Sequence, residues 1–196
     1  MELVKDLRDK TGISVMQCKK ALEDAGGDMD KALVFLQKKG AEIAANKAER
    51  TLKAGRVVSY IHGVGSVGVL LELSSESDFV SKHEDFAALG KDIAMQIAAT
   101  NPAFTKKEDV TEEEKAKVMS AFADEVKDKP EAMREKILAG KIDSFFKEKI
   151  LLEQDFIKDP SVTINTLIQN ATQKFGEKIE IARYVRFVVS AAPAMC

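Results

Sequence analysis

Residues 56–74 have the sequence RVVSYIHGVGSVGVLLELS, in which two runs rich in β-branched side chains flank a glycine-containing connection. Residues 63–66 have the length and the glycines of a hairpin turn. In the second run the apolar side chains alternate with other residues, which places them on one side of a strand. These side chains are Val67, Val69, Leu71 and Leu73. The stretch therefore predicts an antiparallel β-hairpin.

The same connection matches the pattern Gly-x-Gly-x-x-Gly at residues 63–68, a spacing known from dinucleotide-binding proteins. In those proteins the third glycine opens a helix that holds the pyrophosphate, whereas here a strand pattern follows. We interpret the glycines as a turn. A dinucleotide-dependent enzyme stays as an alternative hypothesis, and titration with nicotinamide and flavin cofactors would test it.

Three short amphipathic segments separated by glycines precede the hairpin and predict a compact three-helix module over residues 1–40, similar to ubiquitin-associated domains. Ser14 with Gln17 three residues later forms a capping-box pattern at the second helix. Asp28 is the expected N-cap of the third helix, and Gly40 is the expected end of it.

The alanine-rich, basic residues 41–55 predict a solvated helical linker, and residues 56–196 predict one α+β core domain. Helical spacing recurs at residues 86–97 and 163–175. The charged stretch 111–147, interrupted by a proline, predicts a helical hairpin that projects from the domain.

The last run of the chain, residues 179–189, alternates apolar and polar side chains. It is expected to pair with the hairpin and complete an antiparallel sheet of three strands. The predicted fold class is therefore α+β, with an N-terminal helical module, a linker, and a three-stranded sheet with packed helices.

Composition limits the classes of function. The chain has 196 residues, 45% hydrophobic and 32% charged, with a net charge of −2. That charge offers no positive field for a phosphate backbone, so we expect no direct nucleic-acid binding. No apolar run reaches the roughly 20 residues that span a bilayer, and the first residues do not resemble a secretory leader. We expect a cytoplasmic protein that does not bind membranes.

Catalytic and metal-binding patterns are scarce. His62 and His83, the two histidines, lack metal-ligand spacing, and no serine or cysteine has a nucleophile signature. With two cysteines, Cys18 and Cys196, there is no disulfide framework. Cys18 is expected to be buried, and whether the terminal Cys196 crosslinks two chains is open. We predict no enzymatic step, no metal and no cofactor.

The polar loop after the hairpin contains Ser77, Asp78, Phe79 and Val80. From chemistry alone two interpretations stay open. In the first, Asp78 caps the next helix and Phe79 packs into the core. In the second, Phe79 projects as an anchor for a partner, because aromatic side chains carry much of the energy at interface centres.

Two separate motifs resemble the short form of the translation elongation factor Ts family. The first comprises residues 3–8 (LVKDLR) and 16–22 (MQCKKAL), and the second comprises residues 77–82 (SDFVSK). The similarity continues to residues 183–187 (RYVRF) and so covers essentially the whole chain. Gln17 stands where the family usually has aspartate, and Ser77 where threonine is usual.

The resemblance implies a guanine nucleotide exchange factor for elongation factor Tu, which it would bind both with GDP and without nucleotide. It implies that the N-terminal module docks on the GTP-binding domain of that partner through Arg8, Val15 and Met16. It implies that the partner's Mg²⁺ and phosphate site is disturbed by Ser77, Asp78, Phe79 and Val80.

Length suggests a further partner. Longer members of the family carry two core halves, whereas this chain has room for one, which would leave its sheet exposed on one side. We therefore expect a homodimer. An alternative to the whole assignment is a generic helical binding module that uses the same three N-terminal helices for an unrelated protein.

Overall fold

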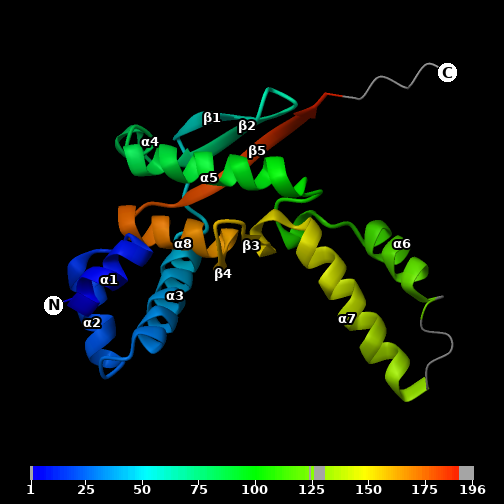
Figure 1. The fold of residues 1–196 in the computed structure, drawn as a ribbon, viewed down its shortest axis with the longest axis horizontal. Coiled ribbons are helices and arrows are strands. Elements are labelled where there is room, and N and C mark those ends of the chain that lie inside the picture. Colours follow the sequence, from blue (N-terminus) through cyan, green and yellow to red (C-terminus); the bar gives the residue numbers. More distant parts are fainter. Residues whose placement is uncertain (1, 124, 126–130, 190–196) are drawn as a thin grey trace. The chain divides into compact units, whose positions relative to one another are not determined.

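The computed structural model describes residues 2–123, 125 and 131–189, without the side chains of residues 131 and 132. It divides into two compact units, Met1–Ala98 with Asn165–Cys196 and Ala99–Ile164. Helices and an antiparallel three-stranded sheet make up the first unit (Figure 1). The α+β class expected from the sequence is confirmed.

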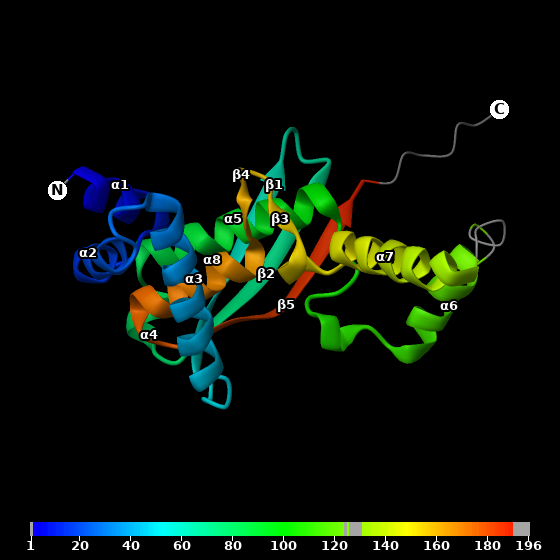
Figure 2. The ribbon, with the colours of Figure 1, turned by 90° about the horizontal axis from the view of Figure 1, so that it is seen from below.

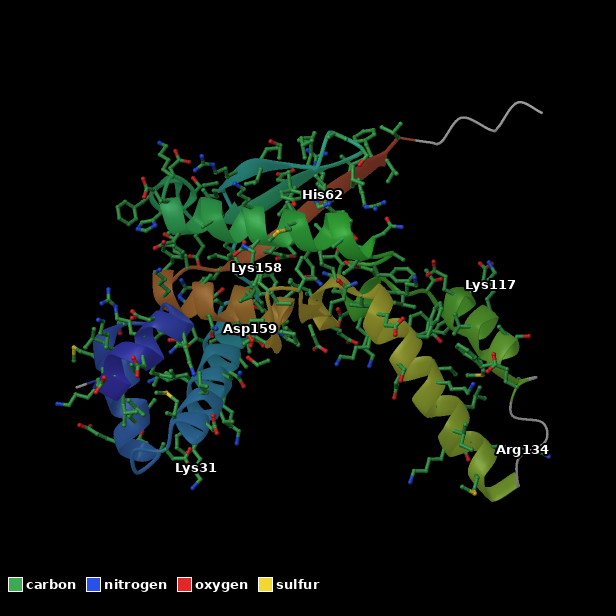
Figure 3. All side chains as sticks on the ribbon, in the orientation of Figure 1. Lys31, His62, Lys117, Arg134, Lys158 and Asp159 are labelled. Carbon is green, nitrogen blue, oxygen red and sulfur yellow. The ribbon has the colours of Figure 1, made fainter. Side chains whose placement is uncertain are left out.

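The chain begins with three helices, α1 (Glu2–Thr11), α2 (Val15–Asp24) and α3 (Met29–Asn46). Ser14 caps α2 by accepting a hydrogen bond from the Gln17 N–H at 3.4 Å. Asp28 caps α3 by accepting one from the N–H of Lys31 at 3.0 Å, and Figure 3 labels Lys31 in the first turn of that helix. These caps confirm two predicted helix starts.

The three helices share a core of buried side chains, which are Leu7, Ile13, Cys18, Ala21, Leu22, Ala32 and Leu36. Cys18 is buried as expected, and its burial raises the pKa of its thiol above the ordinary value. The apolar periodicity of the first 40 residues predicted the helical members Leu7, Ala21, Leu22, Ala32 and Leu36, whereas Val15 and Met16 of the same pattern are exposed and Ile13 was not expected.

The expected end of the third helix at Gly40 is wrong, because α3 continues to Asn46. Gly40 is buried, and a Cβ there would lie 3.2 Å from Gln173 Oε1 and 3.6 Å from Gln169 Cβ. The glycine thus serves the close approach of two helices and not a helix end. The first six residues of the predicted linker are helical, and the module boundary at residue 40 stays a prediction.

The sheet contains β1 (Ala54–His62), β2 (Val67–Ser75) and β5 (Ile179–Val188) in the order β1-β2-β5, with both pairs antiparallel. The β1–β2 turn uses Gly63 at φ 55° and Gly65 at φ 96°. Such angles favour glycine, which has no Cβ. Gly68 lies inside β2 and opens no helix. The hairpin prediction is therefore confirmed. A strand follows the third glycine in place of the helix that a dinucleotide-binding site requires.

Helix α5 (Glu84–Thr100) covers one face of the sheet and lies between the sheet and α8 (Ile164–Phe175) (Figures 1 and 2). Gly90 of α5 approaches β1 so closely that a Cβ would lie 2.7 Å from Val58 Cγ2. The buried side chains on this face include Val69, Leu71 and Leu73 of β2 and Phe86, Ile93 and Ile97 of α5. The two sets were both expected from their periodicity.

A β-bulge in β5 reverses which side chains face α5. Leu73 pairs with Ile181 and Glu72 pairs with Arg183, so Ala182 is the additional residue. Before the bulge Ile179 and Ile181 are buried, whereas after it the odd-numbered side chains are exposed on the opposite face. Both sets had been expected from one simple alternation.

The face of the sheet opposite α5 carries exposed apolar side chains from all three strands, which we call the open face. Its members are Val57, Ile61, Leu70, Val185 and Phe187. Ile61 and Phe187 are each 63% exposed. One face of the sheet is thus packed and the other is accessible, within the described residues.

The second unit contains helices α6 (Glu112–Ala123) and α7 (Glu131–Lys149), the short helices η1 (Lys107–Asp109) and η3 (Leu151–Glu153), and the strands β3 (Asp155–Phe156) and β4 (Asp159–Thr163). Figure 3 shows Lys117 on α6 and Arg134 on α7 extending from the ribbon. Val110, Phe146 and Ile150 form the buried core. The two helices confirm the predicted pair, and the projection of the hairpin stays a prediction.

Two features considered in the sequence lie outside the described residues. These are the proline that interrupts the charged stretch, Pro130, and the terminal thiol of Cys196.

Candidate partner-binding site

The loop after β2 presents one aromatic side chain to solvent. It folds into a single helical turn, α4 (Asp78–Ser81), in which Phe79 is 80% exposed and Val80 beside it is 1% exposed. The core interpretation of Phe79 is therefore wrong, because Val80 provides the buried anchor of this turn. Asp78 makes an exposed ion pair with Lys82 at 3.7 Å.

The residue before this turn, Ser77, is bound from a distant part of the chain. Its N–H donates to Glu177 Oε2 at 2.9 Å, and its hydroxyl donates to Glu177 Oε1 at 2.5 Å. Its carbonyl accepts from the Ser75 hydroxyl at 3.0 Å. Ser77 is the N-cap of α4, yet its side chain makes no bond to that helix.

A second carboxylate makes the reciprocal connection. Glu76 accepts the backbone N–H of Lys178 at 2.6 Å and binds the Arg50 guanidinium at 3.1 Å. The bond from the Lys178 N–H, and then the Arg50 guanidinium, hold the pKa of Glu76 below its ordinary value. Two successive residues shortly before Phe79, Glu76 and Ser77, are therefore bonded to residues 177–178.

The N-terminal helices display the other three positions that the sequence singled out. Arg8 lies near the end of α1, and Val15 and Met16 open α2 on the other side of the turn at Gly12. All three side chains are exposed, Met16 at 83%. An unbranched, polarisable side chain such as Met adapts readily to a partner surface.

Met16 lies at a groove between α2 and α3 whose lining combines apolar and basic side chains. The lining residues include Lys20, Phe35, Leu36 and Lys39. Phe35 and its neighbour Val34 are exposed, and the sequence analysis did not single them out. Both are apolar residues that lie between the buried positions of α3, Ala32 and Leu36. An apolar side chain beside the predicted buried face of a helix is the sequence pattern that could have identified them.

Figures 1 and 2 both show α4 and the first two helices at the same end of their unit, on the left. The two sets of candidate residues are thus available from one end of the unit. Among the described residues no group of three or more His, Cys, Asp or Glu side chains could hold a metal ion. The arrangement is suited to contacts with a macromolecule.

Comparison with known proteins identifies the family. Residues 5–191 match the family model described as elongation factor TS. The chain belongs to the elongation factor Ts family. It is therefore related to the elongation factors of protein biosynthesis.

Individual relatives named elongation factor Ts cover nearly the full chain. The protein of Desulforamulus reducens is 49% identical over 189 residues, which are 94% of this chain and 86% of that protein. The protein of Thermodesulfovibrio yellowstonii is 48% identical over 189 residues, 96% of this chain and 94% of that protein. The protein of Fervidobacterium nodosum is 45% identical over 190 residues, 96% of each chain. The chain covers most of the length of each of these relatives, which agrees with the short form of elongation factor Ts expected from the sequence.

Proposed function

We propose that this chain is a guanine nucleotide exchange factor that binds elongation factor Tu carrying GDP and promotes release of the GDP. Membership of the elongation factor Ts family supports the proposal. The observation that carries it is the exposed Phe79 on a backbone that Glu177 and Val80 hold in place. The proposal assigns no chemical step, cofactor or catalytic residue to this chain.

In this proposal the two sets of candidate residues have different roles. Arg8, Val15 and Met16 dock the N-terminal helices on the GTP-binding domain of the partner. Phe79 then inserts beside the Mg²⁺ and phosphate site of that domain, and Asp78 helps to position the loop. An inserted aromatic side chain displaces the groups that hold Mg²⁺, an ion that requires near-ideal octahedral coordination.

Thermodynamic coupling explains how binding becomes exchange. A factor that binds nucleotide-free elongation factor Tu more tightly than the GDP form must weaken GDP binding by the same ratio. Each tenfold weakening requires about 1.4 kcal/mol of contact that is made only in the nucleotide-free complex. One anchored aromatic side chain is able to supply one or two such steps.

Release of a fluorescent GDP analogue from elongation factor Tu tests the proposal. Substoichiometric amounts of this chain are expected to accelerate release, and Phe79→Ala is expected to lose most of the acceleration. Val64→Ala removes an exposed apolar side chain from the β1–β2 turn instead and serves as the matched control. No acceleration by the unaltered chain would contradict the proposal.

We also propose that two copies of this chain associate through the open face. Its five exposed apolar side chains come from three adjacent strands, and contiguous apolar surface of this kind is typical of interfaces. Burial of these five side chains against a second copy would remove their apolar surface from water.

Two further expectations stay proposals, a cytoplasmic location and the absence of direct nucleic-acid binding. No helix in the part of the chain that the structure describes combines the length and hydropathy needed to cross a bilayer.

A further inference from the structure

Two short segments, residues 76–77 and 177–178, are joined by reciprocal carboxylate bonds. Glu177 accepts both the N–H and the hydroxyl of Ser77, and Glu76 accepts the N–H of Lys178. Bonds from backbone N–H groups to an ionised carboxylate are about twice as strong as bonds between neutral groups. We call this arrangement the 76–177 clasp.

The 76–177 clasp fixes residues 76 and 77 of the loop, which lie beyond the end of β2. β2 ends at Ser75, and the next buried side chain is Val80. Between these two points Ser77 is the residue whose N–H and side chain are both bound by Glu177. Phe79 is 80% exposed, so the direction of its side chain depends largely on the backbone on either side of it.

The same segment also binds the chain that leaves the N-terminal helices. Lys47 Nζ donates to the Gly176 carbonyl at 2.7 Å, and Lys178 Nζ donates to the Ala48 carbonyl at 2.7 Å. Arg50 completes the connection through Glu76. Residues 176–178 therefore contact both the Phe79 loop and the segment that follows α3.

We infer that Glu177, together with Glu76, is a positioning residue for nucleotide exchange. The inference rests on the exchange function proposed above. The carboxylates hold Phe79 at a fixed place relative to the docking helices, so that one binding event brings both to the partner. A preorganised loop spends no binding energy on ordering itself. Loss of the clasp therefore slows GDP displacement more than it weakens docking.

Steady-state release of fluorescent GDP from elongation factor Tu, measured over a range of exchange-factor concentrations, separates the two effects. For Glu177→Ala we expect a maximal rate roughly tenfold lower, a loss equivalent to about 1.4 kcal/mol. The half-saturating concentration should change less than twofold. Glu177→Gln keeps an oxygen for the Ser77 N–H and should recover part of the rate.

The matched control is Glu180→Gln. Glu180 also pairs with Lys178, at 2.9 Å, but among the described residues it makes no hydrogen bond or ion pair with Ser77 or Glu76, so its variant should match the unaltered chain. Equal losses in Glu180→Gln and Glu177→Gln would overturn the inference.

A double-mutant cycle with Phe79 identifies a positioning role. If Glu177 acts through Phe79, adding Glu177→Ala to Phe79→Ala should lower the maximal rate less than twofold further. A tenfold further loss in that background would overturn the inference, because it would show that Glu177 acts independently of Phe79.

Amide hydrogen exchange tests the clasp without the partner. Glu177→Ala should speed exchange of the Ser77 amide at least tenfold while leaving amides in α2 unchanged. Unchanged exchange at Ser77 would overturn the clasp. A chain that lacks exchange activity but shows this local effect would contradict the proposed function alone, so the two failures are distinguishable.

Discussion

The side-chain amide of Gln173 on α8 donates a 2.7 Å hydrogen bond to the side-chain oxygen of Gln17 on α2. Gln173 is buried, and its own Oε1 has no hydrogen-bond partner among the described residues. The bond joins the N-terminal helices to the sheet-bearing part of the same unit. The capping-box pattern had suggested a different partner for Gln17, the backbone of its own helix.

This bond predicts an asymmetric response to mutation. Gln17→Ala leaves a buried N–H₂ group of Gln173 unpaired and should lower the free energy of unfolding by about 1–3 kcal/mol. Replacing both glutamines by methionine removes the polar groups at similar volume and should restore most of the loss. Urea unfolding measures both, and a double variant less stable than Gln17→Ala would contradict the account.

Phe79 and Val80 are adjacent residues with opposite expected phenotypes. Phe79→Ala removes an exposed side chain and should leave the free energy of unfolding within about 0.5 kcal/mol of the unaltered chain. Val80→Ala removes buried methyl groups and should cost about 1–3 kcal/mol. Thermal unfolding checks this pair, and equal destabilisation of the two would show that Phe79 is packed in solution.

Two glycines in helices should respond oppositely to alanine. At Gly90 a Cβ would lie 2.7 Å from Val58 Cγ2, so Gly90→Ala should destabilise by about 1–3 kcal/mol through overpacking. Gly140 of α7 has open space around it, so Gly140→Ala should stabilise by about 0.5–1 kcal/mol through helix propensity. Chemical unfolding followed by circular dichroism measures the change in the free energy of unfolding for each variant.

Glu76 should contribute a pH-dependent part of the stability. The pKa of this carboxyl is lowered from 4.5 in the folded chain, first by the Lys178 N–H. The unfolded chain therefore binds the proton more readily, and the contribution of Glu76 is present above about pH 4.5 and lost as pH falls through the lower folded pKa. The stability difference between the unaltered chain and Glu76→Gln should shrink over that acidic range, and a difference that grew on acidification would contradict the sign.

The open face predicts a change of mass in solution. Light scattering should give twice the 21.5 kDa of one chain, and Phe187→Asp should return it to the mass of one, because a charge at the interface is costly to bury. Met119→Asp alters an exposed apolar side chain on α6 and should have no effect. A single-chain mass for the unaltered protein at micromolar concentration would contradict the dimer.

Local periodicity was sufficient to predict most elements of the fold. The alternation from Val67 to Leu73 and the helical spacing of Phe86, Ile93 and Ile97 both report which side of an element is buried, and these side chains form the packed face. Signals of this kind depend on residues that are close in sequence.

Features that depend on residues far apart in sequence could not be predicted from local periodicity. Gly40 looked like a helix end because its neighbour on α8 is far away in sequence. Glu177 lies 100 residues from Ser77, and no local sequence pattern at either residue predicts their hydrogen bond. The exposure of Phe79 follows from the burial of Val80, which anchors the α4 turn in the core. Local sequence does not show which of these two adjacent side chains is buried.

The bulge at Ala182 gives a single strand two different surfaces. In a regular strand of the same length, with no bulge, Val185 and Phe187 would face α5 and Tyr184 and Arg186 would face outward, since neighbouring side chains alternate between faces. The apolar character of the open face therefore depends on the bulge in β5 as much as on the composition of that strand. Deletion of Ala182 would leave Leu73 opposite Ile181 and Glu72 opposite Arg183 in a regular ladder, and should therefore keep Val185 and Phe187 on the open face.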